Sequence, residues 1–144
     1  MPHEDALRNV QLFSQFASKD LTRLGRAMVE RNYRKGETIV KEGEQAVAFF
    51  IITSGKVEVS QSAGSKKSQM LDTLGPTASF GEMALLDGGA RSATVNAILD
   101  TTCLVMSRWD FVAELQTNPH MAVAMLPILS RRLRDVEAKL AATH

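Results

Sequence analysis

The sequence has few of the residues from which metal and redox centres are built. It contains one cysteine and three histidines among 144 residues. A single cysteine cannot form an internal disulfide, which fits a reducing compartment, and it cannot by itself hold an iron–sulfur cluster. The histidines are His3, His120 and His144, and all lie outside the segments for which we predict strands. Since a metal-dependent oxygenase needs several histidine and carboxylate ligands that converge from strands, we expect neither a metal centre nor an enzyme.

A strong net charge and long apolar runs are also missing. The 17 lysines and arginines nearly balance 16 acidic residues, so the net charge of +1 gives no reason to expect a nucleic-acid or membrane surface. No apolar run approaches the roughly 20 residues that a membrane-spanning helix needs. The start of the chain, residues 1–5, is polar and acidic, unlike a signal peptide. We therefore expect a cytoplasmic protein that forms one domain over residues 1–144.

The middle of the chain, residues 32–107, predicts short strands. Residues 56–60 alternate Val57 and Val59 with polar residues, which is typical of a strand with one buried face. Many short strands with regular turn signals favour a sandwich or a barrel. Cys103 lies in an apolar strand, so we expect a buried, unreactive thiol. The predicted strands cover residues 33–43, 48–52, 56–60, 70–74, 94–98 and 101–106, with a polar hairpin loop at 62–68.

Helical patterns flank this segment on both sides, over residues 1–31 and 108–144. On the N-terminal side, apolar residues at roughly helical spacing predict a helix over 6–17, and Ser18 can cap a second helix that runs to about Glu30. On the C-terminal side, residues 107–115 predict a short amphipathic helix. A longer helix then starts with Asn118 as its cap and Pro119 at its first position, where proline is well tolerated.

The long C-terminal helix carries an apolar stripe. Its members alternate spacings of four and three residues, as in the seam of a short coiled coil. Such a seam favours a partner helix, and a symmetric homodimer is the assembly that we expect. The alternative is that the stripe packs on the chain's own barrel. The stripe consists of Ala122, Leu126, Leu129, Leu133, Val136 and Leu140.

The stretch with the most chemistry is residues 80–95, which read FGEMALLDGGARSATV. The apolar run at 83–86 can wind into one helical turn, whose first N–H groups would point at an anion. Arg91 can offer two donors to two phosphate oxygens at once. Glu82, which only accepts hydrogen bonds when ionised, suits a sugar hydroxyl rather than the phosphate. Together these groups indicate a phosphorylated ribose.

This stretch resembles the phosphate-binding cassette of the cyclic nucleotide-binding domain, the family of the catabolite activator proteins and the cAMP-dependent protein kinase regulatory subunits. The resemblance implies a mainly β fold with flanking α-helices: a jelly-roll barrel (double-stranded β-helix), N-terminal helices and a C-terminal lid and dimerisation helix. It implies that Glu82 binds the ribose 2′-hydroxyl and that Arg91 binds the cyclic phosphate. Ala90 departs from the family, many members of which have proline there. By this resemblance the ligand-binding residues are Gly81, Glu82, Met83, Ala84, Arg91, Ser92 and Ala93.

The resemblance predicts a sensor that binds a cyclic nucleotide and moves its C-terminal helices, without catalysis. We expect cAMP to be favoured over cGMP. Ser92 does not decide the base, because a hydroxyl after the arginine occurs in family members of both kinds. In the catabolite activator, the lid helix offers a hydroxyl to adenine. In an alignment without gaps from Asn118, Val136 stands at the position of that hydroxyl. We therefore expect weaker base discrimination than in that protein.

Other functions stay open at this point. A barrel that has lost its ligand would serve as a dimerisation or interaction module. We expect no DNA-binding domain in this chain and therefore no direct control of transcription by it. The chain would act as a stand-alone sensor through an unidentified protein effector, or as the regulatory part of a longer protein; Met1 favours the first.

Overall fold

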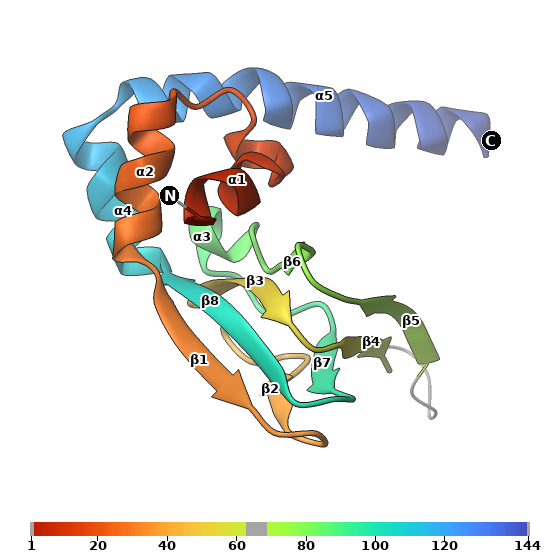
Figure 1. Cartoon of the computed structure of the whole chain (residues 1–144). Coiled ribbons are helices and arrows are strands. Elements are labelled where there is room, and N and C mark those ends of the chain that lie inside the picture. The colour runs from red at the N-terminus through yellow and green to blue at the C-terminus, as the bar shows by residue number, and fades with distance from the viewer. Residues whose placement is uncertain (1, 63–68, 144) are drawn as a thin grey trace. The chain divides into compact units, whose positions relative to one another are not determined.

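The computed structural model describes residues 2–62 and 69–143 and divides the chain into two compact units (Figure 1). One unit is a β-barrel, Ala27–Val112. The other is helical and combines the two ends of the chain, Met1–Arg26 and Ala113–His144.

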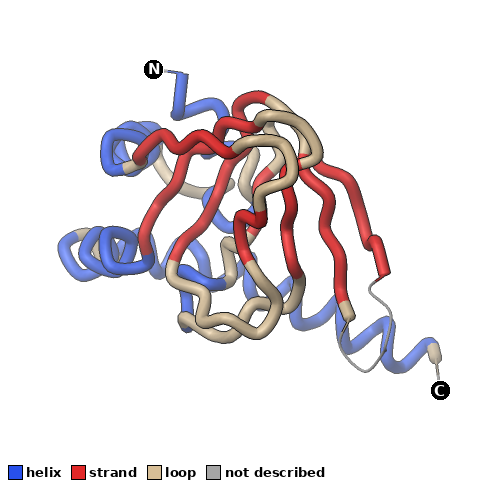
Figure 2. Tube along the Cα trace, turned by 90° about the horizontal axis from the view of Figure 1, so that it is seen from below, coloured by secondary structure: helices blue, strands red, loops and turns tan. Residues whose placement is uncertain are grey.

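The barrel unit consists, over its described residues, of two antiparallel sheets of four strands each. The sheet orders are β1-β8-β3-β6 and β2-β7-β4-β5. Figure 2 shows the strands in red and the loops that connect them in tan. This is a sandwich or barrel, as the strand pattern predicted, and the mainly β jelly-roll architecture that the resemblance implied. The strands are β1 (Val29–Tyr33), β2 (Thr38–Val40), β3 (Ala48–Ser54), β4 (Val57–Gln61), β5 (Gln69–Leu74), β6 (Ser79–Phe80), β7 (Thr94–Ala97) and β8 (Thr101–Ser107).

The barrel encloses an apolar core to which most strands contribute one face. Val57 on β4 is fully buried and pairs with Leu74 on β5, as predicted. The alternation predicted for residues 56–60 was wrong at its end, because the register with β5 shifts after Val59 and Ser60 is buried. Cys103 is also fully buried, and burial raises the pKa of its thiol to about 11, so the thiol stays protonated at neutral pH, as predicted. The buried core consists of Phe50, Ile52, Val57, Phe80, Val95 and Cys103.

Two predicted boundaries at the start of the barrel were wrong. Helix α2 ends at Ala27, and β1 begins at Val29, because this segment pairs with β8 instead of continuing the helix to Glu30. The strand predicted over 33–43, bracketed by two turn glycines, is too long: Tyr33 ends β1, and β2 begins after the turn at Gly36, which has a φ of 93°. A residue in the left-handed conformation cannot continue a strand, and glycine adopts this conformation without steric penalty. The predicted loop at 62–68 lies outside the described residues except for Ser62.

The helical unit contains short elements from the N-terminus and longer helices from the C-terminus. The predicted helix over 6–17 was wrong, because α1 ends at Arg8 and a 3₁₀ turn follows. Leu7, Val10, Phe13 and Phe16 recur every third residue, which is the period of a 3₁₀ turn. The elements are α1 (Pro2–Arg8), η1 (Gln11–Phe13), α2 (Ser18–Ala27), α4 (Arg108–Thr117) and α5 (His120–Ala142); α2 and α4 cross the boundary between the units.

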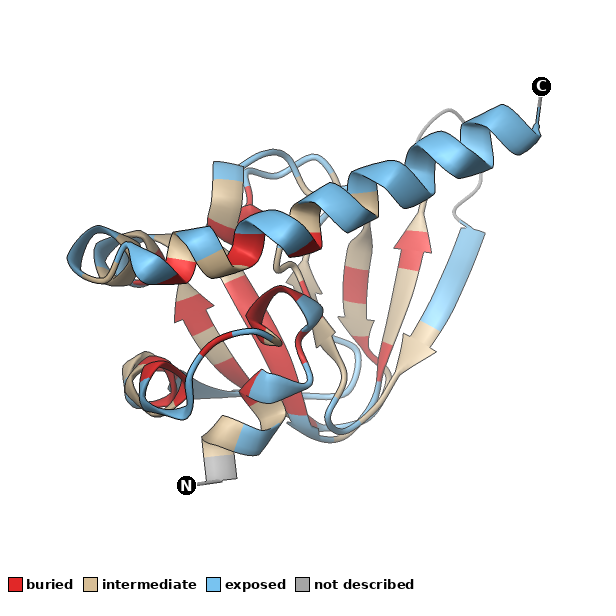
Figure 3. Cartoon of the chain, turned by 90° about the horizontal axis from the view of Figure 1, so that it is seen from above, coloured by how far each residue is buried: buried red, intermediate tan, exposed pale blue. Residues whose placement is uncertain are grey.

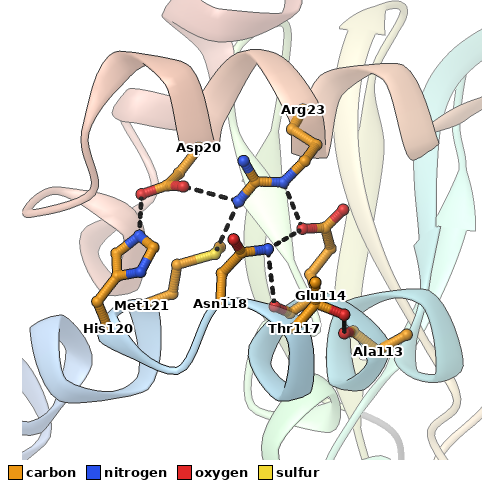
Figure 4. Close-up of polar contacts among 8 residues, drawn as sticks. All are labelled: Asp20, Arg23, Ala113, Glu114, Thr117, Asn118, His120 and Met121. Carbon is orange, nitrogen blue, oxygen red and sulfur yellow. Dashed lines mark hydrogen bonds and ion pairs between the residues drawn. The ribbon is translucent and has the colours of Figure 1, made fainter.

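A polar cluster joins α2 to the end of α4 and the start of α5 (Figure 4). Arg23 lies at its centre and donates from Nη2 to Oδ1 of Asp20 at 2.7 Å and from Nε to Oε2 of Glu114 at 2.6 Å. His120 Nε2 lies 2.9 Å from the other carboxylate oxygen of Asp20. Burial by itself raises the pKa of Asp20, but the hydrogen bonds from Arg23 and His120 outweigh it and hold that pKa below its ordinary value.

The junction between α4 and α5 is bonded differently from the predicted cap. The side-chain amide of Asn118 donates to the carbonyl oxygen and to the carboxylate of Glu114, at 3.3 and 3.2 Å. Asn118 therefore closes the end of α4 with its side chain instead of capping α5. Its own carbonyl accepts the N–H of Met121 at 3.0 Å.

Helix α5 has one buried and one exposed apolar face. Near its start it contacts η1, and Met121, Met125 and Ile128 are buried. Figure 3 shows the second half of the helix as almost entirely exposed. Its exposed apolar residues include Leu126, Leu133, Val136 and Leu140, four members of the predicted stripe.

Candidate ligand-binding site

The barrel unit contains a pocket of about 330 Å³ at the cassette. This volume lies at the lower end of the range of small-molecule sites, about 300–1,000 Å³. Six of the seven residues predicted to bind ligand line it; the seventh, Glu82, is half-buried between two lining residues. The lining residues are Val40, Ala46, Val59, Phe80, Gly81, Met83, Ala84, Asp87, Gly89, Ala90, Arg91, Ser92, Ala93 and Val95.

Arg91 is the cation of this pocket, and its guanidinium is held from two sides. Nη2 donates to the carbonyl oxygen of Ala48 at 2.7 Å. The guanidinium carbon lies 5.7 Å from the centroid of the Phe50 ring, and Phe50 stacks on Phe80 with centroids 4.8 Å apart. A cation over an aromatic face is attracted by the ring quadrupole. The plane of the guanidinium is therefore fixed before any ligand arrives.

The charge of Arg91 has no carboxylate partner among the described residues. Burial lowers the pKa of Arg91, and the charge of Glu44 opposes this. Arginine nevertheless stays charged in proteins. A half-buried cation without a counter-ion, facing a pocket, is suited to an anionic ligand.

The chain on both sides of Arg91 is fastened to a neighbouring loop. The N–H of Arg91 donates to the carbonyl of Glu44 at 2.8 Å, and its carbonyl accepts the N–H of Gly43 at 2.9 Å. Ala90 forms an isolated β-bridge with Gln45. These backbone bonds fix the loop although Ala90 stands where many relatives have proline.

The helical turn predicted at 83–86 is present as α3 (Ala84–Asp87). Before it, Gly81 has a φ of 83°, and a Cβ built there would lie 2.5 Å from Nη1 of Arg91. Only glycine therefore lets the arginine come this close. The N–H of Ala84, which we predicted to face the anion, donates to the carbonyl of Gly81 at 3.1 Å in this structure.

The other side of the pocket depends on strand residues that the motif did not indicate. Gln61 on β4 donates from Nε2 to the carbonyl of Ser92 at 2.9 Å and so holds the residue after the arginine. Val59 lines the pocket from the same strand. The alternation at 56–60 was the available signal for Val59, whereas nothing in the sequence indicated Gln61.

Comparison with known proteins identifies the family. The sequence model of the cyclic nucleotide-binding domain matches residues 30–118. The chain belongs to this family. Its members are regulators, and the domain also occurs within larger proteins that are kinases.

The proteins similar in sequence to this chain include bacterial and mammalian proteins. The cyclic AMP receptor protein of Thermus thermophilus is 36% identical over 110 residues, 76% of this chain and 51% of that protein. The human cGMP-dependent protein kinase 2 is 37% identical over 139 residues, 95% of this chain and 18% of the kinase. The chain thus spans about half or less of the length of these relatives.

A solved structure agrees with the barrel and its flanking helices. The N-terminal domain of a transcriptional regulator from Streptomyces coelicolor has a TM-score of 0.83 and 30% identity, covering 92% of this chain and 94% of that one. In the part of our chain that the structure describes, no helix is long and apolar enough to cross a membrane. No group of three or more histidine, cysteine, aspartate or glutamate side chains in this part is arranged to hold a metal ion.

Proposed function

We propose that the chain is a cyclic nucleotide sensor whose pocket binds cAMP in preference to cGMP. The observation that carries the proposal is Arg91, a half-buried cation without a carboxylate partner in the described residues, held at the wall of the pocket. A cyclic phosphodiester brings one negative charge and oxygens that accept hydrogen bonds. It would replace the missing counter-ion of Arg91 and needs no nucleophile or general base.

The parts of the nucleotide divide among the residues of the cassette. The phosphate takes Arg91 Nη1 and backbone N–H groups of the surrounding turn, with Gly81 leaving room for it. The N–H of Ala84 joins them only if it gives up its 3.1 Å bond to Gly81. The ribose 2′-hydroxyl donates to Glu82, whose carboxylate only accepts.

The apolar wall supports the preference for adenine. Apart from Arg91, the side chains of the lining that carry hydrogen-bonding groups are Asp87 and Ser92. Guanine carries a carbonyl oxygen, a ring N–H and an amino group on the edge where adenine carries an amino group and a bare ring nitrogen. Polar groups that are buried without partners are costly. Adenine leaves fewer such groups unpaired. Because the preference rests on apolar packing rather than on a dedicated hydrogen bond, we expect it to stay below about a hundredfold.

The signal passes to the C-terminal helices, and a second copy of the chain covers the exposed stripe of α5. Nucleotide binding favours one arrangement of these helices if that arrangement binds more tightly. The effector is an unidentified protein or a further domain. Four of the stripe's apolar side chains are 53–62% exposed, which supports a helical partner.

A thermal-unfolding screen tests the proposed function. The protein, freed of any co-purified nucleotide, is heated with cAMP, cGMP or the open-chain 5′-AMP. At equal concentrations, a ligand that binds only the folded state raises the transition temperature more if its dissociation constant is lower. We expect the largest increase with cAMP, a smaller one with cGMP and the smallest with 5′-AMP. An unchanged transition with both cyclic nucleotides would favour a dimerisation module without a ligand.

A further inference from the structure

Arg108, the first residue of α4, contacts the C-terminal end of α3. Its Nη2 lies 3.4 Å from the carbonyl oxygen of Leu86. Its backbone N–H donates to the carbonyl of Val47 at 2.8 Å, just before β3. A Cβ built on Gly88, which ends α3, would lie 3.3 Å from both Cδ and Nε of Arg108. Arg108 therefore packs directly on the segment whose residues Ala84 and Asp87 line the pocket.

The end of α3 needs the donor that Arg108 supplies. The last carbonyl groups of a helix have no partner within it, and they carry partial negative charge. Gly88 satisfies one of them, since its N–H donates to the carbonyl of Ala84 at 3.0 Å. The carbonyl of Leu86 is left to the guanidinium. A planar, permanently charged group with several donors suits this position.

The bonding of Arg108 is incomplete in this arrangement. Its Nε is buried and has no hydrogen-bond partner among the described residues. A buried donor without a partner is unfavourable, and such groups are rare in folded proteins. The contact to Leu86 is also long for a hydrogen bond. A small movement of α3 toward Arg108 would shorten the contact between Nη2 and the carbonyl of Leu86.

We propose that Arg108 is a positioning residue for the nucleotide pocket, and that its contact with α3 tightens when a nucleotide binds. This inference rests on the proposed function, because it concerns the same pocket. Arg108 does not touch the ligand. It acts through α3 and Gly88, which precede Arg91 in the loop of the cassette. If nucleotide binding strengthens the contact between Arg108 and α3, then that contact strengthens nucleotide binding by the same factor.

Two substitutions and one control test this role. Arg108→Gln removes the charge and Nε, and Arg108→Lys keeps the charge but loses the planar donors. Arg34→Gln removes an exposed arginine of the same unit and serves as the control. The dissociation constant for cAMP is measured by calorimetry well below the unfolding transition of each nucleotide-free protein, with circular dichroism to verify folding. We expect about a tenfold loss for Arg108→Gln, a smaller loss for Arg108→Lys, and none for Arg34→Gln.

A second measurement distinguishes positioning from a merely structural role. The Nε–H signal of Arg108 in a ¹⁵N spectrum is assigned by its absence in Arg108→Lys. In the wild type we expect it to exchange more slowly with solvent once cAMP is bound. A lower unfolding temperature with unchanged cAMP affinity, or an Nε–H exchange rate that cAMP leaves unchanged, would overturn the proposal. If the wild type binds no cyclic nucleotide, both the proposed function and this role of Arg108 are overturned. If the wild type binds tightly and Arg108→Gln binds equally well, only the role of Arg108 is overturned.

Discussion

Arg91 donates a 2.7 Å hydrogen bond from Nη2 to the carbonyl oxygen of Ala48. This bond uses one of five guanidinium N–H groups and fixes the orientation of the rest. Nη1 then lies beside Gly81, where an added Cβ would be only 2.5 Å away. The arginine is thus set in place by the barrel and does not lose its side-chain entropy when an anion binds.

Gly81→Ala should weaken both the fold and cAMP binding. The new Cβ would displace Nη1 of Arg91, and a φ of 83° is unfavourable for alanine. We expect the free energy of unfolding to fall by about 1 to 3 kcal/mol. Gly75→Ala is the matched control, because a Cβ there meets nothing within 4 Å. Chemical denaturation and calorimetric titration measure the two effects, and equal behaviour of the two variants would refute this role of Gly81.

Glu82→Ala should remove discrimination against the 2′-deoxy nucleotide. In the wild type, 2′-deoxy-cAMP lacks the hydroxyl that Glu82 accepts, so it should bind more weakly than cAMP. In the variant the two ligands should bind equally, and the loss for cAMP should be smaller than that in Arg91→Ala. Competition against a fluorescent cyclic nucleotide gives the ratio. A ratio that survives the substitution would mean that the ribose lies elsewhere.

Asp20 should make the stability of the helical unit depend on pH. Its carboxylate is 1% exposed and hydrogen-bonded, and its pKa in the folded state lies below the ordinary value. The stabilisation is therefore fully present above the unfolded pKa of about 3.9 and is lost as the pH falls through the lower, folded pKa. Asp20→Asn should lower the free energy of unfolding by about 1 to 3 kcal/mol at pH 7.

The pH profile of this variant carries the test. Urea unfolding from neutral to acid pH should give a difference between wild type and Asp20→Asn that shrinks with acidification. Asp5→Asn, an exposed carboxylate of the same unit, should leave the profile unchanged. A difference between wild type and Asp20→Asn that stays constant over this range would contradict the role of the Asp20 charge.

The exposed stripe of α5 predicts a dimer that one charge can disrupt. Leu133 is 62% exposed, and a glutamate there would lie desolvated within a helix pair. Sedimentation equilibrium should give the wild type twice the chain mass of 15.8 kDa and Leu133→Glu the mass of one chain. Arg131→Glu, on the opposite side of the helix, should remain a dimer. A monomeric wild type would refute the dimer.

The sequence predicted the barrel and the cassette because their signals are local. Alternation marked Val57 and Val59, and residues 80–95 carried the turn, the glycines and the arginine in one stretch. The contacts of Arg108 and Asp20 could not be predicted in this way. Arg108 reaches a carbonyl 22 residues away, and Asp20 pairs with His120 across 100 residues of chain. Helical periodicity and capping signals contain no information about partners so far away along the chain.

The most direct test of the central claim is calorimetric titration of the nucleotide-free protein with cAMP and cGMP, using wild type, Arg91→Ala and the control Arg34→Gln. We expect wild type and control to bind both ligands, cAMP more tightly. Arg91→Ala should lose about 2 to 5 kcal/mol of binding free energy, because the phosphate would be left desolvated and unpaired. Equal binding by Arg91→Ala and wild type would contradict the account, because the anion would then not lie at Arg91.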